Sequence, residues 1–321
     1  MKFVHLHCHS HYSLLDGMPK IDELIKKAKE FKMPALAITD HGVMYGAIEF
    51  YQKAKKAGLK PIIGFEAYVA ASGRHQKIKT DEKRYHLTLL AKNFSGYQTL
   101  IKLCSLGHLE GFYYKPRIDD ELLKKYHQGI ICLSGCIQGE IPQLILAKKF
   151  EAAKRKILFY KEIFGDDFYL EIMPLPKLKG QKEINQTLIQ FSKELKVPVV
   201  ATCDVHYLSP EDAKAHDVLL AIQTKNLVSD KNRLSMKEDD FSFKSQENVI
   251  NFFKDIPQAI ENTLKIAEKC NFEIELGKIE MPKIKIENGF DSFSYLKKLV
   301  EEGVKKRYQK ITPQIKNRSG F

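Results

Sequence analysis

Along the first 225 residues, short hydrophobic runs alternate with longer segments in which hydrophobic residues recur at helical spacing. Val4 and Leu6 lie in the first run, and the segment from Ile21 to Phe31 then carries apolar residues every three or four positions. This alternation predicts strands over 4–6, 35–39, 61–70, 87–91, 129–133, 168–172 and 197–202, and helices over 21–31, 47–57, 97–106, 141–164, 183–195 and 210–222. Seven strands with helical connections predict an α/β fold with a parallel, barrel-like sheet.

The pattern changes toward the carboxyl end of the chain. Strand-like runs thin out beyond about residue 225, and the segments 249–253, 259–270 and 293–308 have helical spacing. A shift in composition near 275–290 ends the alternation of strands and helices. We therefore expect one domain over residues 1–280, followed by a linker and a helical extension over 281–321.

Charge and cysteine content narrow the class of protein. The 321 residues include 52 Lys and Arg against 40 Asp and Glu, and the net charge of +12 suits an anionic partner such as nucleic acid without proving one. The six cysteines are scattered and form no C-x-x-C pair, which indicates a reducing compartment. The polar first residues and the lack of an apolar run of about 18 residues predict neither a signal peptide nor a membrane span. We expect a cytoplasmic protein with no membrane partner.

Histidines and acidic residues recur where the predicted strands end. His7 and His9 are two residues apart, so on a strand both imidazoles face the same side and can bind one metal ion. Similar candidates follow later runs, namely His41, Glu66, Asp204 and His206. The carboxyl ends of barrel strands meet at one mouth, so these side chains are expected to converge there as metal ligands. Taken singly, the histidine pair also fits a polar surface strand, and Glu66 fits a solvated or ion-paired glutamate.

Three segments together resemble a known family. They are His5-Leu6-His7-Cys8-His9-Ser10, Ile38-Thr39-Asp40-His41-Gly42 and Gly64-Phe65-Glu66-Ala67-Tyr68, and they are similar to the PHP (polymerase and histidinol phosphatase) metal-dependent phosphoesterases. Further segments, 86–93, 110–119, 133–136 and 202–207, resemble the amino-terminal domain of bacterial replicative DNA polymerase alpha subunits. The resemblance runs from about residue 3 to about residue 310. It implies a distorted seven-stranded TIM-like barrel of the PHP type.

The resemblance also implies a set of metal ligands. Carried over residue by residue, it implies up to three divalent ions, zinc or manganese, held by His7, His9, Asp16, His41, Glu66, His86, Cys136, Asp204 and His206. His7, His9, Glu66 and Asp204 would hold one ion; Glu66 would bridge to a second ion with His86 and Cys136; and Asp16, His41 and His206 would hold the third. Asp16 and Cys136 stand where the phosphatase branch tends to have His, and both side chains remain competent ligands. Of the set, we expect His41, Asp204 and His206 to act in catalysis.

His86 fits the simple barrel poorly. It precedes its predicted strand instead of following it, so an all-parallel barrel would place it at the wrong end. Either the strand begins earlier than predicted or this segment is irregular.

Basic residues suggest where DNA would bind. The polar stretch Ser72–Arg84, which includes Arg74 and Lys77, is predicted to be an exposed loop that guides the DNA backbone, although such runs are often only solvated. Lys115 and Arg117 follow two tyrosines, and we expect them to contact phosphates while the tyrosines stack on bases.

Three functions therefore compete. The first is the amino-terminal domain of a polymerase alpha subunit, acting with other replication subunits as a metal-dependent 3′→5′ exonuclease on a primer end. The second is a stand-alone phosphatase for a small phosphomonoester. The third is a non-catalytic platform that docks a separate proofreading subunit. No closely spaced Asp triplet of a polymerase palm occurs, so residues 281–321 are expected to be a linker and the truncated start of a palm domain, and the chain alone should not polymerise DNA.

Overall fold

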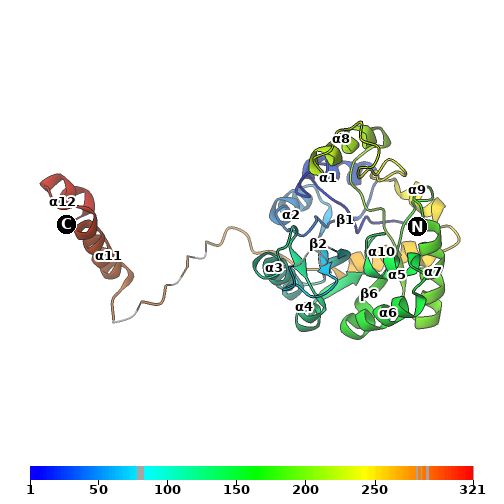
Figure 1. Ribbon diagram of the computed structural model, residues 1–321, viewed down its shortest axis with the longest axis horizontal. Coiled ribbons are helices and arrows are strands. Elements are labelled where there is room, and N and C mark those ends of the chain that lie inside the picture. The colour runs from blue at the N-terminus through cyan, green and yellow to red at the C-terminus, as the bar shows by residue number, and fades with distance from the viewer. Residues whose placement is uncertain (78–82, 280, 283, 287–288, 321) are drawn as a thin grey trace. The chain divides into compact units, whose positions relative to one another are not determined.

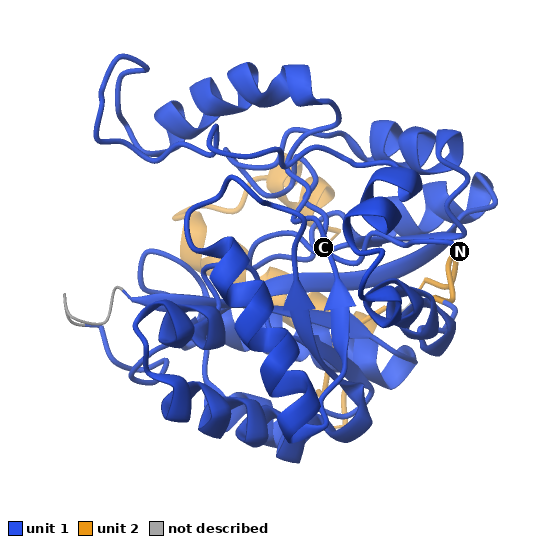
Figure 2. Ribbon diagram, turned by 90° about the vertical axis from the view of Figure 1, so that its right-hand side faces the viewer, with its two compact units in different colours: residues 1–273 blue, residues 274–321 orange. Residues whose placement is uncertain are grey.

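The computed structural model describes residues 1–321 apart from 78–82, 280, 283, 287–288 and 321. The chain separates into two compact units, Met1–Glu273 and Ile274–Phe321, which are coloured separately in Figure 2. Unit 1 is an α/β structure in which helices surround a curled sheet (Figure 1). No helix among the described residues is long and apolar enough to cross a membrane.

The sheet of unit 1 contains seven strands. In chain order they are β1 (Ala35–Ile38), β2 (Lys60–Ala70), β3 (Arg84–Ala91), β4 (Arg117–Ile118), β5 (Ile130–Leu133), β6 (Phe168–Ile172) and β7 (Val199–Ala201). Six of them follow the order β1-β2-β3-β5-β6-β7, and the two-residue strand β4 pairs with β2 off this path. The predicted class, a distorted seven-stranded α/β barrel with a helical extension, is confirmed.

The predicted uniform parallel direction is wrong for one strand. β3 runs antiparallel to both of its neighbours, β2 and β5, whereas the pairs β1·β2, β5·β6 and β6·β7 are parallel. Between β2 and β3 the structure describes residues 71–77 and 83, which contain no helix, and a connection without a crossover helix is typical of antiparallel strands. The amino end of β3 therefore lies at the carboxyl ends of its neighbours, where Tyr68 pairs with His86.

The first hydrophobic run was predicted as a strand, but it is an irregular extended segment. Its backbone accepts hydrogen bonds from β1, with Ala37 N donating to His5 O at 2.9 Å. On its other side, His9 N donates to Val205 O at 2.8 Å and Val205 N donates to His7 O at 3.2 Å. The segment thus links β1 to the chain that follows β7, and β4, which was not predicted, makes up the count of seven strands.

Most helices lie close to their predicted ranges. In unit 1 they are α1 (Ile21–Glu30), α2 (Ala47–Lys56), α3 (Phe94–Leu109), α4 (Asp120–Lys125), α5 (Glu140–Leu146), α6 (Phe150–Phe164), α7 (Gln181–Leu195), α8 (Ala213–Gln223), α9 (Gln246–Phe252) and α10 (Pro257–Lys269). The single helix predicted over 141–164 is two helices, because the chain turns at Lys148 with a positive φ of 58°. The predicted helix 210–222 begins as a 3-10 turn over Pro210–Asp212, and α4 was not predicted.

Helix α10 closes one end of the barrel, and the apolar core lies at this end. Side chains from the first extended segment and from six strands, including Leu90 near the carboxyl end of β3, form one buried apolar cluster with Ile266, Ala267 and Cys270 of α10 and its flank. Asn262 of α10 donates to Val199 O at 2.8 Å, which fixes the helix against β7. This closed end leaves the opposite end of the barrel for the polar side chains described below.

Unit 2 contains α11 (Ser292–Arg307) and α12 (Pro313–Ser319). Asp291 caps α11 by accepting hydrogen bonds from Phe293 N and Ser294 N, both at 2.9 Å. The helix predicted over 293–308 therefore corresponds to α11, while α12 was not predicted. That residues 281–321 begin a palm domain stays a prediction.

Candidate metal centre

Four predicted ligands converge at the open end of the barrel. His7 and His9 lie on the extended first segment, Glu66 lies in β2, and Asp204 follows β7 with a positive φ of 50°. His7 Nε2 lies 3.3 Å from Glu66 Oε1 and 3.2 Å from Asp204 Oδ1, and His9 Nε2 lies 3.2 Å from both His7 Nε2 and Asp204 Oδ1. Two ligands that each lie 2.0–2.1 Å from a tetrahedral zinc ion are about 3.3 Å apart. The spacing of these four side chains therefore suits a single ion.

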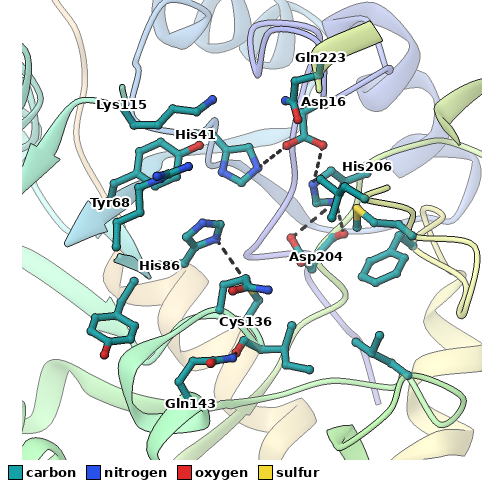
Figure 3. Close-up of a pocket in the computed structure, with 18 of the residues that line it drawn as sticks. Asp16, His41, Tyr68, His86, Lys115, Cys136, Gln143, Asp204, His206 and Gln223 are labelled. Carbon is teal, nitrogen blue, oxygen red and sulfur yellow. Dashed lines mark hydrogen bonds and ion pairs between the residues drawn. The ribbon is translucent and has the colours of Figure 1, made fainter. Parts of the chain in front are cut away.

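Glu66 also contacts a second group of candidate ligands. Its Oε1 atom lies 3.0 Å from His86 Nδ1 and 3.5 Å from Cys136 Sγ. Figure 3 shows His86 and Cys136 side by side, and Cys136 Sγ is 3.5 Å from His86 Nδ1. His86 reaches this position because β3 is antiparallel, so the difficulty that its place in the sequence raised is resolved. Glu66 is fully buried between the two groups, which is where a bridging carboxylate would have to lie.

A third group lies beside the first. His41 Nε2 lies 3.1 Å from Asp16 Oδ2, and His206 Nε2 lies 3.6 Å from Asp16 Oδ1 (Figure 3). The rings of His41 and His206 flank that of His9, with centroid distances of 4.1 and 4.4 Å. Ligand atoms of His9, His41 and His206 approach one another within 4.8 Å, as do those of His7, His9 and Glu66 and those of His41, Glu66 and His86. All nine predicted ligands thus belong to one contiguous cluster.

Several atoms of the cluster lack hydrogen-bond partners among the described residues. These buried atoms are Asp16 Oδ1, His41 Nδ1, Glu66 Oε2 and His216 Nε2. His41 Nδ1 lies 2.6 Å from Glu66 Oε2, yet the pair does not have hydrogen-bond geometry. Buried polar atoms without partners are costly and call for an explanation such as a bound ion. Together with the mixture of nitrogen, oxygen and sulfur donors, they fit a zinc or manganese site.

The electrostatics of the cluster favour ionised carboxylates. Burial alone would favour their neutral forms, but His86, His7 and His41 hold the pKa of Glu66 well below its usual range. Against the same effect of burial, His7 and His206 lower the pKa of Asp204. Ionised carboxylates of this kind are ready to bind cations.

The histidines of the cluster differ from one another. Burial, together with the charges of His41 and His206, lowers the pKa of His9 to about 3, so its imidazole is neutral at pH 7. The pKa of His7 is raised despite burial, because Asp204, Glu171 and Glu66 surround it. Binding of an ion to His7 would therefore release a proton from the Nε2 atom.

Glu171 was not identified from the sequence. It lies in β6, fully inside the barrel, and its Oε1 atom is 2.6 Å from His7 Nδ1. It also accepts hydrogen bonds from Thr202 Oγ1 at 2.6 Å and from Gly135 N at 2.9 Å. A carboxylate that holds the far nitrogen of a histidine fixes its orientation and leaves Nε2 facing the ion. The signal in the sequence was a single acidic residue inside an otherwise hydrophobic strand.

Asp40 acts on the cluster through serines. Its carboxylate accepts hydrogen bonds from Ser10 N at 2.7 Å and from Ser13 Oγ at 2.8 Å. Ser13 Oγ in turn lies 3.0 Å from His9 Nδ1 and accepts a hydrogen bond from His41 N at 3.1 Å. Asp40 therefore orients His9 through Ser13, and its position in the sequence beside His41 does not produce a direct bond between the two side chains in the described structure.

Two of the four residues predicted to contact DNA lie inside the protein. Arg117 is 1% exposed, and its guanidinium donates to Gly111 O, Arg74 O and Gln76 O at 2.6 to 3.1 Å. Arg74 is also buried and forms ion pairs with Asp119, Glu110 and Glu121. The predicted role of these arginines in DNA contact does not fit their positions, because local acceptors and carboxylates use their donors.

Lys77 and Lys115 remain accessible. Lys77 is exposed, while residues 78–82 of the same predicted loop, including Lys79, Asp81 and Glu82, lie outside the described residues. Lys115 lines the pocket over the cluster of candidate ligands, with its ammonium 5.7 Å from the centre of the Tyr68 ring. Burial, and then the charge of Arg84, lowers the pKa of Lys115.

The cluster opens into a pocket of about 500 Å³. Asp16, His41, His86, Cys136, Asp204 and His206 line its floor, and Tyr68, Lys115 and Gln143 lie around them (Figure 3). Lys83 and Arg84 also line the pocket. The site therefore combines a group of cation ligands with basic side chains, an arrangement that suits a phosphate ester.

Comparisons with known proteins identify the family. A family model described as "PHP domain" matches residues 5–174. The chain is 49% identical over its whole length to the DNA polymerase III subunit alpha of Borreliella burgdorferi, and 43% identical over 96% of its length to that of Thermus aquaticus. It spans about a quarter of these relatives, 28% and 26% of their lengths.

Solved structures resemble the chain more distantly. A Bifidobacterium adolescentis protein described as a metal-dependent phosphoesterase aligns with 78% of this chain and 96% of its own, at 12% identity and a TM-score of 0.43. The family is therefore established by the sequence matches. With the matched residues 5–174 covering more than half of its length, the chain belongs to the PHP domain family and resembles the alpha subunits of bacterial DNA polymerase III.

Proposed function

We propose that this chain is the amino-terminal PHP domain of a bacterial replicative polymerase alpha subunit and that it hydrolyses phosphodiester bonds at a 3′ DNA end. The observation that carries the proposal is the spacing of about 3.2–3.3 Å among ligand atoms of His7, His9, Glu66 and Asp204. Asp204 also lines the pocket, whose walls include the basic residues Lys83, Arg84 and Lys115. A function in replication would place the protein in the cytoplasm, with DNA and other polymerase subunits as partners.

The residues have distinct roles in this proposal. Divalent ions bound to the nine ligands would neutralise phosphate charge and activate water for an in-line displacement. His41, Asp204 and His206 line the pocket in which the reacting phosphate would bind, and Glu171 and Ser13 fix the orientations of His7 and His9. Lys115, at the wall of the pocket, would contact a non-bridging phosphate oxygen of the substrate.

Metal analysis combined with a nuclease assay tests this function. We expect the purified chain to bind divalent ions stoichiometrically and to release nucleotides from a mismatched 3′ end when zinc or manganese is added. His9→Ala should abolish both properties, whereas His127→Ala, which changes a histidine whose Nδ1 atom lies 2.9 Å from the nearby Lys124 O, should leave both unchanged. Bound metal without hydrolysis would assign the ions a structural role in a non-catalytic platform. Hydrolysis of phosphomonoesters alone would indicate a small-molecule phosphatase.

Substitutions of Lys115 and Arg117 distinguish a residue that contacts the substrate from one that has a structural role. Lys115→Ala should weaken binding of single-stranded DNA and lower the slope of log affinity against log salt by about 1. Arg117→Ala should instead destabilise the fold, because three carbonyl groups lose their donor. If Lys115→Ala leaves both the affinity and the salt slope unchanged, Lys115 does not contact the phosphate backbone.

A further inference from the structure

A smaller pocket adjoins the metal cluster. It has a volume of about 170 Å³ and shares Asp16, His41, Tyr68, Lys115 and Gln223 with the larger pocket described above. The two pockets therefore meet at the candidate ligands, and a phosphate held there would have one pocket on each side. The candidate ligands do not need this smaller pocket in order to hold metal ions.

Three exposed aromatic side chains line the small pocket. Tyr45, Phe112 and Tyr114 line it and are 60%, 51% and 67% exposed, although large apolar side chains usually contribute to the core. Tyr45 comes from the loop after β1, whereas Phe112 and Tyr114 come from the loop before β4. Exposed aromatic faces next to a phosphate site are typical of surfaces on which nucleobases stack.

The protein holds these two loops close together. Gly42 has a positive φ of 64°, and a Cβ atom there would approach Pro116 Cγ to 2.8 Å and the Tyr68 ring to 3.1 Å. Gly42 O also lies 3.2 Å from His108 Nε2, near the end of α3. The loop that carries His41 therefore packs directly against the loop that carries the aromatic side chains.

The buried arginine supports the same wall. Arg117 Nε donates to Gly111 O at 3.0 Å, next to Phe112, and the Arg117 guanidinium lies 5.2 Å from the centre of the Tyr113 ring. The rings of Tyr113 and Tyr114 meet edge to face at 4.7 Å. The buried side chain of Arg117 thus fixes the loop from inside the protein, while Phe112 and Tyr114 stay exposed. This is a role for Arg117 that the sequence did not indicate.

The two pockets differ in charge. Lys83 and Arg84 line the larger pocket but not the smaller one, in which Lys115 is the basic residue among the described residues. A strand that extends away from the metal cluster carries further phosphates and suits the larger, more basic pocket. A terminal nucleoside carries none beyond its scissile phosphate and suits the small aromatic pocket.

We propose that the small pocket binds the base of the terminal nucleotide, so that the scissile phosphate lies at the metal cluster and the upstream strand follows the larger pocket. This rests on the proposed phosphodiesterase function and adds the substrate class: a polynucleotide end with an intact base, recognised by stacking on Tyr114 and Phe112 without regard to sequence. A small phosphomonoester or an abasic end would leave these rings unused.

An abasic 3′ terminus tests the proposal. With the full chain, kcat/KM for an oligonucleotide with an ordinary 3′ nucleotide should exceed that for the same oligonucleotide with an abasic 3′ residue by about 5- to 150-fold. Tyr114→Asn should lower this ratio severalfold while Phe112 remains in place, and it removes the ring without added strain because Asn tolerates the positive φ of 58° at this position. Tyr114→Phe keeps the ring and should keep the ratio. Phe94→Ala removes an exposed ring at the opposite end of α3 and should have no effect on it.

Binding provides a second readout. In EDTA, an oligonucleotide with 2-aminopurine at its 3′ end should lose fluorescence on binding to the unmodified chain and to Tyr114→Phe, and should lose less on binding to Tyr114→Asn. Equal hydrolysis of both oligonucleotides by the unmodified chain, or unchanged quenching with Tyr114→Asn, overturns the pocket assignment and leaves the proposed function standing. If no oligonucleotide is hydrolysed, the proposed function fails, and the quenching alone then decides the pocket.

Discussion

The two ends of the barrel in unit 1 are built in opposite ways. The end near α10 is filled by apolar side chains from six strands and the helix, including Ile266 and Val200, which are fully buried. The other end buries histidines and carboxylates, and several of their atoms lack hydrogen-bond partners among the described residues. Burial of apolar surface at one end therefore stabilises the folded state. Desolvation of charged side chains at the other end offsets part of that stabilisation.

Within a single sheet, side chains at one end therefore stabilise the fold, and those at the other end form the candidate functional site. In barrels of this kind, residues at the carboxyl ends of the strands serve catalysis and those at the amino ends serve stability. The antiparallel strand β3 contributes to both ends in the opposite order. Its first residues supply His86 to the ligand cluster, and Leu90, near its carboxyl end, belongs to the apolar core. Substitutions at the two ends should therefore change different measurements.

The largest effect should follow the loss of the central carboxylate. Glu66→Gln keeps the shape of the side chain but removes the charge that contacts His7, His41 and His86. Removal of an outer-shell partner costs 10–100-fold in metal affinity or activity, so loss of a direct ligand shared by two groups should cost at least about a hundredfold. Metal content by mass spectrometry and nucleotide release should both fall.

A matched carboxylate serves as the control for that change. Glu30→Gln alters an exposed residue at the end of α1 and should leave metal content and hydrolysis as they were. Because the apolar end is untouched, Glu66→Gln should still unfold cooperatively in urea. Unchanged metal stoichiometry in Glu66→Gln would contradict the assignment of a bridging ligand.

A substitution at the apolar end should have the reverse profile. Ile266→Ala creates a cavity in the core cluster and should lower the free energy of unfolding by about 2–5 kcal/mol, as measured by urea denaturation in EDTA. Metal content per folded molecule should not change. Ile101→Ala, at a partly exposed position of α3, should stay within about 0.5 kcal/mol of the unmodified chain. A large fall in metal content with Ile266→Ala would show that the two ends are not independent.

His216 offers a smaller effect at the site end. This buried residue of α8 has its Nε2 atom 3.6 Å from Asp16 Oδ1, and both atoms lack hydrogen-bond partners among the described residues. We expect His216→Ala to weaken binding of the ion at Asp16 by about 10–100-fold, because Asp16 loses a neighbour that orients it. Competition with a fluorescent chelator measures this affinity. His216→Gln, which retains a donor, should recover part of it, and equal losses in both variants would point to packing alone.

The sequence was most informative where backbone geometry determines the position of a side chain. His7 and His9 could be paired from their spacing, and their convergence with Asp204 followed from the ends of predicted strands. The direction of β3 was missed, although the polar, non-helical stretch between residues 70 and 84 is typical of a connection between antiparallel strands.

Partners of buried charges could not be predicted in the same way. Arg117 was expected to contact phosphates because it follows two tyrosines, but its acceptors are backbone carbonyls that only the fold brings together. Glu171 and His216 were missed for the same reason, because the partner of each, His7 and Asp16 respectively, is more than 150 residues away in the chain. Tertiary contacts of single residues carry no periodic signal in the sequence.

The smallest effect concerns pH and an ion-pair network at the apolar end. Asp167, just before β6, pairs with Lys92 after β3 and with Lys269 at the end of α10. Burial opposes its ionisation, but hydrogen bonds from Lys269 and Lys92 lower its pKa.

A carboxylate with a lowered pKa stabilises the folded state above its unfolded pKa of about 3.9, and this contribution is lost as the pH falls through the lower folded value. Asp167→Asn should therefore be less stable than the unmodified chain at pH 7 in EDTA, and the difference should shrink below about pH 4. Asp22→Asn, at an exposed carboxylate paired with Lys53, should show little change at either pH, and a pH-independent gap for Asp167→Asn would mean that Asp167 stabilises this end by packing rather than by charge.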